Sequence, residues 1–113
     1  MRKSDPGTED PNLRMAAGIL RALAHPLRMK ILEFIDQNDK INVNKIYNSL
    51  GLEQSITSQH LRILRNAELV KPQRDGKFIF YSINYPRMTD SVAAINKFLE
   101  RSEMSTETET EAE

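Results

Sequence analysis

The sequence has 113 residues, enough for one domain with a modest hydrophobic core. It contains no cysteine, which excludes disulfides, thiol-based redox sensing and thiolate metal sites, and it contains no apolar run as long as a membrane span. The formal net charge is 0, but residues 12–101 carry 14 basic and 8 acidic residues, a balance of +6 that suits a polyanionic partner.

Both ends of the chain have the composition of disordered segments. Residues 1–11 contain two prolines, a glycine and few apolar groups, and they lack the apolar stretch of a secretory signal. Residues 102–113 contain five glutamates and few apolar residues. We therefore expect a disordered N-terminal segment (residues 1–11), one folded domain (residues 12–101) and a disordered acidic tail (residues 102–113), in a cytoplasmic protein.

Two amphipathic helices are predicted in the first third of the chain. The first begins near Asn12, a good N-cap residue, and places Leu13, Ala17 and Leu20 on one stripe. His25-Pro26 ends this helix and opens the second one, because proline suits the first position of a helix. The second helix is expected to bury Leu27, Ile31, Phe34 and Ile35.

A tight turn between two further helices follows. Residues 41–43 are expected to form a short strand, and the next helix is predicted to end at Gly51, a typical C-cap residue. Leu50-Gly51-Leu52 has the form of the turn in a helix-turn-helix unit. The helix after the turn starts near Glu53, which is a poor N-cap residue.

The helix after the turn has two faces. Thr57, Leu61 and Leu64 recur at the spacing of an inward face, whereas Ser55, Ser58, Gln59 and Arg62 form a separate polar face. Glutamine can pair with adenine, arginine with guanine, and serine can reach a base or a phosphate. The alternative is a helix face that is merely solvated. The candidate DNA-binding residues of this helix are Gln54, Ser55, Thr57, Ser58, Gln59, His60, Arg62 and Arg65.

A β-hairpin with a basic tip follows that helix. Residues 70–74 and 77–83 are predicted as its strands, and Asp75-Gly76 as its two-residue loop, because both residues tolerate positive φ. Arg74 and Lys77 at the tip are candidates for contacts with DNA phosphates or the minor groove. An ordinary solvated turn is the alternative for this segment by itself.

A last amphipathic helix is predicted after Tyr85-Pro86. Its apolar stripe and that of the first helix would leave apolar surface exposed in a single chain, which pairing across a two-fold axis would bury. Packing of the two helices on each other within one chain is the alternative. The candidate dimer-interface residues are Leu13, Ala17, Leu20, Val92, Ile95 and Leu99.

Several spaced motifs resemble one family. Residues 23–32, LAHPLRMKIL, resemble the opening of ArsR-type winged helix-turn-helix repressors. The residues of the predicted polar helix and of the hairpin resemble that family's recognition helix and wing. The resemblance covers about residues 14–100. It implies a dimeric bacterial-type transcriptional regulator, usually a repressor that a chemical signal releases from DNA.

The sequence departs from this family at both of the family's metal sites. Metal-sensing members carry Cys-x-Cys at the start of the third helix, where this chain has Asn42-Val43-Asn44, and amide oxygens cannot replace soft thiolates. The last helix offers Asp90 but no histidine. The two histidines, His25 and His60, are far apart in sequence and lack the spacing of zinc ligands, although either could titrate near neutral pH. We expect no metal and no other cofactor.

A second departure concerns the start of the recognition helix. Thr57 stands where the family usually has valine or isoleucine, and Ile56 stands where it usually has a small residue. An Ile56 side chain that faces DNA could contact a thymine methyl group. The alternative is that Ile56 rotates inward and distorts the helix.

The predicted fold is mostly α with a small β-hairpin (α+β), a winged helix-turn-helix dimerised through its first and last helices. The predicted function is that of a transcriptional regulator, a repressor by resemblance, which binds double-stranded DNA at a palindromic operator as a homodimer. The alternative is a winged-helix protein-interaction module without sequence-specific DNA binding. We expect no catalytic activity, because the sequence lacks both a paired histidine and carboxylate and a glycine-rich phosphate loop. The residues indicate no membrane partner and do not identify an effector.

Overall fold

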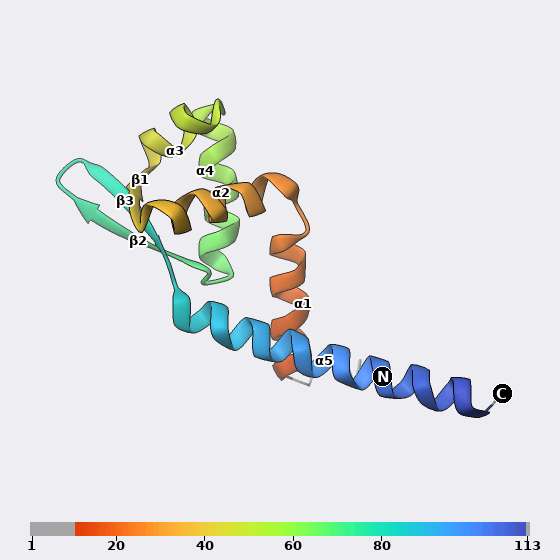
Figure 1. Cartoon of the computed structure of the whole chain (residues 1–113). Helices are drawn as coiled ribbons and strands as arrows, with labels where there is room; N and C mark the ends of the chain where they lie inside the picture. The colour runs from red at the N-terminus through yellow and green to blue at the C-terminus, as the bar shows by residue number, and fades with distance from the viewer. Residues whose placement is uncertain (1–10, 113) are drawn as a thin grey trace, which may run out of the picture.

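The computed structural model describes residues 11–112, and it describes side-chain environments for residues 11–100. In this part of the chain a winged helix-turn-helix fold combines five helices with a three-stranded antiparallel sheet (Figure 1). The elements are α1 (Pro11–Leu23), α2 (Pro26–Asn38), β1 (Lys40–Asn42), α3 (Val43–Leu50), α4 (Gln54–Asn66), β2 (Val70–Asp75), β3 (Phe78–Ile83) and α5 (Tyr85–Ala112).

The boundaries of the terminal helices differ from those expected. The prediction for residues 1–10 lies outside the described residues, and Pro11 already belongs to α1. At the other end, α5 continues through Ala112, where a disordered acidic tail was expected from residue 102. The sequence after Arg87 contains no glycine or proline that would stop a helix, which accounts for the difference.

Local capping residues set the ends of the inner helices. His25 lies one residue before Pro26, the first residue of α2. Its Nδ1 atom accepts a hydrogen bond of 3.1 Å from the Leu27 amide and so caps the helix. Asn42 Oδ1 accepts one of 2.8 Å from the Lys45 amide and caps α3 in the same way. Gly51 ends α3 with a φ of 67°, which confirms its predicted place after the helix.

The sheet has the strand order β1-β3-β2, and its β2–β3 hairpin projects from the helices as the wing (Figure 1). The hairpin loop is Gly76-Lys77 rather than the predicted Asp75-Gly76, because Asp75 pairs with Phe78 in the ladder. Of the two loop residues only Gly76 has positive φ, at 65°, as in a type II′ turn and unlike a type I′ turn. The short strand β1 pairs with β3 through Ile41 and Tyr81, and it begins at Lys40, one residue earlier than expected.

The hydrophobic core lies where α2, α3 and α4 meet the sheet. Its members include Ile31 and Ile35 of α2, Ile46 of α3, and Leu61 and Leu64 of α4, all at most 1% exposed. In α4 the buried face is the one that the apolar spacing predicted. In α2, Leu27 and Phe34 are only partly buried, and Leu32, which was not predicted, joins the core at 7% exposed. This core fixes α4 relative to α3 and the wing.

Two glycines provide a matched test of the turn before α4. An added Cβ meets no atom within 4 Å at Gly51 or Gly18, but only Gly51 has positive φ. We expect Gly51→Ala to lower the free energy of unfolding by about 1 kcal/mol through backbone strain. Gly18→Ala, within α1, should raise it by up to about 1 kcal/mol. Urea unfolding measures both, and an unchanged Gly51→Ala midpoint would contradict the assigned turn.

Candidate nucleic-acid interface

The inner face of α4 is locked into the core. Thr57, Leu61 and Leu64 are at most 1% exposed, and the Thr57 hydroxyl donates a hydrogen bond of 2.9 Å to the Glu53 carbonyl. Thr57 is therefore a buried residue of the helix start, which corrects its inclusion among the candidate DNA-binding residues. A threonine fits this buried position because its hydroxyl finds a backbone partner one turn earlier.

The outer face of α4 is polar and exposed, as predicted. The side chains on this face come from three successive turns of the helix and are all exposed. They are Gln54, Ser55, Ser58, Gln59, Arg62 and Arg65. Glu53, the residue before the helix, makes no side-chain cap, so the first amides of α4 have no side-chain acceptor from it. Ile56 is 40% exposed and sits beside this face, so it does not rotate inward.

His60 faces away from the outer face of α4. Its ring lies beside that of His25, with centroids 4.6 Å apart, and its Nδ1 atom lies 3.3 Å from Nη1 of Arg28. Burial, and then the nearby His25 and Arg28, lower the pKa of His60 below its ordinary value of 6.5. The ring contacts the start of α2 and remains partly exposed, so a contact between His60 and DNA stays a prediction.

Arg28 links α1, α2 and α4. Its Nε donates a hydrogen bond of 2.6 Å to the carbonyl of Ala22, and its Nη2 donates one of 3.2 Å to the carbonyl of Arg21, at the end of α1. With its contact to His60, one guanidinium group therefore ties the end of α1 to the recognition helix. Arg28 belongs to the family motif, but the sequence pattern assigned it no role, because its partners lie in two other helices, α1 and α4.

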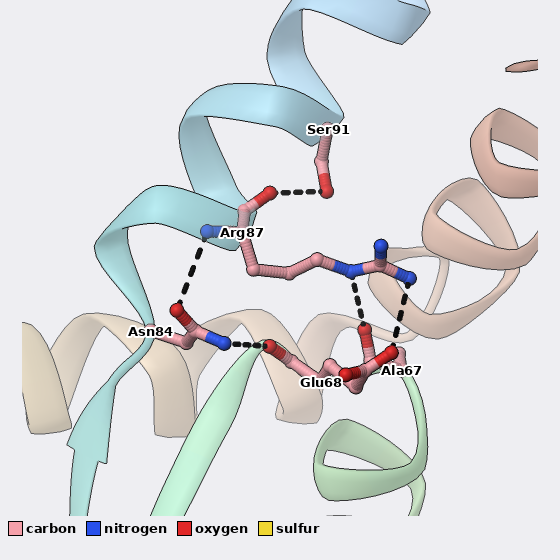
Figure 2. A network of polar contacts seen from close by, with 5 residues as sticks. All are labelled: Ala67, Glu68, Asn84, Arg87 and Ser91. Atoms are coloured by element: carbon pink, nitrogen blue, oxygen red, sulfur yellow. Dashed lines mark hydrogen bonds and ion pairs between the residues drawn. The ribbon is translucent and has the colours of Figure 1, made fainter.

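A second arginine holds the C-terminal end of α4 (Figure 2). Arg87 Nε donates a hydrogen bond of 3.1 Å to the carbonyl of Ala67, the residue that ends α4, and its Nη2 lies 3.8 Å from a carboxylate oxygen of Glu68. Asn84 caps α5 by accepting from the Arg87 amide at 3.3 Å, and its own side-chain amide donates to the Glu68 carbonyl at 2.9 Å. Ser91 donates to the Arg87 carbonyl at 2.7 Å. The start of α5 is thus joined to the end of the recognition helix.

The wing has an exposed basic tip. Arg74 and Lys77 are both exposed, and Lys77 Nζ lies 5.8 Å from the centroid of the Phe78 ring. At the base of the wing, Lys40 Nζ lies 5.2 Å from the centroid of the Phe80 ring. Two aromatic rings of β3 thereby support lysine side chains on the wing surface.

The candidate dimer residues divide into two sets. Helices α1 and α5 pack on each other within the chain and bury Ala16 and Ala94, so the intramolecular alternative holds for their inner faces. Ile95 is partly buried against the core and Leu13 is half-buried. The remaining candidates stay exposed: Ala17, Leu20 (44%), Val92 (52%) and Leu99 (50%). Phe98, which the sequence reasoning did not include, is also exposed, at 38%.

Comparison with known proteins agrees with this architecture. Residues 25–71 match the family model described as bacterial regulatory protein, arsR family. The transcriptional repressor PagR of Bacillus anthracis is 38% identical over 80 residues, which cover 71% of this chain and 80% of PagR. The chain belongs to the ArsR family of transcriptional regulators.

Further similarities extend the ArsR match over most of the chain. The HTH-type transcriptional regulator Rv0081 of Mycobacterium tuberculosis is 36% identical over 92 residues, which cover 81% of each sequence. The crystal structure of NolR from Sinorhizobium fredii has a TM-score of 0.63 and 33% sequence identity, with 92% of this chain and 96% of that chain covered. The names of the matched family and relatives are those of transcriptional regulators and repressors, which are not normally enzymes.

The structure gives Asn42 a role other than metal binding. Asn42, at the position of the first family cysteine, uses its side-chain oxygen to cap α3. His25 and His60 do come together, contrary to what their sequence separation suggested, but the adjacent group is the cationic Arg28. Among the described residues there is no group of three or more histidine, cysteine, aspartate or glutamate side chains that could hold a metal ion.

None of the described helices is long and apolar enough to span a membrane.

The contact between Arg28 and His60 predicts a pH dependence of stability. The neutral His60 ring accepts from Arg28, and its lowered pKa means that the unfolded chain takes up a proton more readily than the folded chain. Stability should therefore be intact above pH 6.5, the ordinary histidine value, and should fall as the pH drops below it.

Thermal unfolding at pH values on either side of 6.5 measures this effect. His60→Gln keeps a neutral acceptor and should flatten the dependence, whereas Lys30→Gln on the exposed surface of α2 should leave it as in the wild type. A slope that His60→Gln does not reduce would show that other groups cause it.

Proposed function

We propose that this ArsR-family regulator is a homodimer that represses transcription by binding a palindromic operator in the cytoplasm. The observation that carries the proposal is the exposed polar face of α4, which the burial of Thr57, Leu61 and Leu64 holds outward. Ser55, Gln59 and Arg62 present there the donors and acceptors that can pair with base edges in a major groove. No enzymatic role is proposed.

The exposed apolar residues of α1 and α5 support the homodimer. Leu20, Val92 and Leu99 lie outside the contact that the two helices make within the chain. Exposed apolar residues of this kind are stabilised when a second copy covers them, and two-fold symmetry allows the same residues to serve both chains. Such a dimer would present two copies of α4 to successive major grooves, about 34 Å apart.

The wing supports contacts with the DNA backbone. Arg74 and Lys77 are exposed at the end of a hairpin that projects away from the helices (Figure 1). Flexible cations at such a position can bind phosphates, which adds affinity but little sequence preference. The proposed division is therefore base reading by α4 and backbone binding by the wing. The PagR name, which denotes a repressor, supports repression as the outcome.

Base reading by α4 can be tested with alanine variants. Gln59→Ala and Arg62→Ala should each weaken binding to a site recovered by the wild-type protein from a random DNA pool by about 1–3 kcal/mol, and should relax the preference at one base pair. Lys97→Ala, which removes an exposed charge from α5, is the matched control for Arg62→Ala. Fluorescence anisotropy with single-base variants of the site provides the measurement.

The wing gives a contrasting result in the same assay. Lys77→Ala should lower affinity for all sequences alike and reduce the salt dependence by about one phosphate contact. If Gln59→Ala and Arg62→Ala behaved as Lys77→Ala does, α4 would contact only the backbone. If both bound like the wild type, α4 would not be the recognition helix.

Dimerisation through α1 and α5 can be tested by charge insertion. The double variant Leu20→Glu and Val92→Glu should sediment as a monomer, because two like charges would be buried where the copies meet. Met29→Glu places the same charge on an exposed apolar residue of α2, outside that surface, and should remain dimeric. A wild-type chain that sediments as a monomer, or a double variant that stays dimeric, would contradict the proposed interface.

A further inference from the structure

A cavity of about 670 Å³ that is open to solvent lies between α1 and the C-terminal end of α4. The start of α2 and the first turn of α5 complete its walls through Arg28 and Arg87. Its volume falls within the range of small-molecule sites in proteins, about 300–1,000 Å³. Neither the recognition face of α4 nor the wing lines it.

The lining combines apolar walls with positive charge. Apolar side chains come from α1 and α4, among them Met15, Ile19 and Ile63. Four arginines line the same cavity: Arg14, Arg21, Arg28 and Arg87. None of the described lining residues is acidic. An uncharged apolar ligand would match only the apolar part of the lining, whereas a molecule with an apolar body and an anionic group would match both parts.

The two inner arginines are the same residues that hold α4. Arg28 contacts His60 of α4, and Arg87 donates to the carbonyl of Ala67 at the end of α4. A bound carboxylate is a stronger acceptor for a guanidinium group than a neutral imidazole or a backbone carbonyl. An anion in the cavity would therefore compete with His60 for Arg28, and for Arg87 it would compete with both the Ala67 carbonyl and the Glu68 carboxylate 3.8 Å away. Loss of these contacts would change how the recognition helix is held against α1 and α5.

We propose that this cavity binds a small organic anion with an apolar body, such as an aliphatic carboxylate, as an effector of the regulator. The proposed binding of the anion depends only on the cavity, whereas the proposed effect of the anion on DNA binding rests on the function proposed above. The apolar walls distinguish this ligand from a DNA phosphate, which has no apolar part to cover Met15, Ile19 and Ile63. They fit one end of a fatty or aromatic acid.

Gly18 provides a selective way to fill the cavity. It lines the cavity, and an added Cβ at this position meets no atom within 4 Å, so there is room for a side chain to begin here. Gly18→Leu should therefore fold and occupy the site, and Gly18→Ala is its matched control. The contribution of the positive charge is tested by the double variant Arg14→Gln and Arg21→Gln, in which Arg28 and Arg87 remain in place. Lys30→Gln with Lys97→Gln removes two exposed positive charges elsewhere.

The experiment is calorimetric titration of the full chain with octanoate, with 1-octanol and octylammonium as probes of the same chain length. We expect one octanoate per chain, weaker binding of both other probes, no binding to Gly18→Leu and retained binding to Gly18→Ala. The double arginine variant should bind octanoate about tenfold more weakly, and the double lysine variant should match the wild type. The NMR signal of the His60 ring should shift with octanoate in the wild type and not in Gly18→Leu.

Three results would overturn the proposal. Absence of octanoate binding to the wild type would do so, as would equal binding of 1-octanol or equal binding to Gly18→Leu. A change of oligomeric state in Gly18→Leu, with no octanoate binding to the wild type, would instead assign the cavity to a second copy of the chain. Octanoate binding that leaves the affinity for the operator unchanged would refute the effector role. A wild-type chain that binds no DNA even without octanoate would refute the proposed function, but not the proposed binding of octanoate.

Discussion

The burial of one stripe of α4 determines the rest of the DNA-facing surface. Thr57, Leu61 and Leu64 are enclosed by the core, and each leucine contributes about 1.5–3 kcal/mol through loss of contact with water. Residues at positions between them, such as Gln59 and Arg62, must then point outward, because rotation of the helix would bury polar groups without partners. The same packing that stabilises the domain therefore presents the polar face. A separate device to orient the recognition helix is not required.

Packing fixes the rotation of α4, whereas two arginines connect its flanks to the terminal helices. Arg28 joins it to the end of α1 through His60, and Arg87 joins its C-terminal end to α5. Since α1 and α5 also carry the exposed apolar residues proposed for dimerisation, the distance between two recognition helices in the proposed dimer would depend on these contacts. A ligand that draws the arginines into the cavity would change that distance, and metal ligands would not be needed for a response. A response to such a ligand suits this chain, because Asn42, at the position of the first family cysteine, caps α3 and is not a thiolate ligand.

Features encoded by neighbouring residues were predictable from the sequence. Proline and glycine mark the helix ends near Pro26 and Gly51, and the spacing of apolar residues predicts the inner face of α4. The hairpin was predicted, but its loop was displaced by one residue because glycine satisfies the turn in either register. The orientation of His60 was missed because its partner Arg28 lies 32 positions away in the sequence. The cavity and the Arg87 contacts were also missed, because they exist only after α1, α4 and α5 come together.

The most direct test of this account is the set of DNA sequences that the full chain selects from fragments of its own genome at about 150 mM salt, where non-specific phosphate contacts are weakened. Base reading by two copies of α4 predicts enrichment of one short palindrome whose half-sites are spaced by about one helical turn, about 10–10.5 base pairs. Uniform weak binding that disappears as salt is raised would contradict it. That result would show that the exposed face of α4 does not read bases and that the basic domain meets another partner.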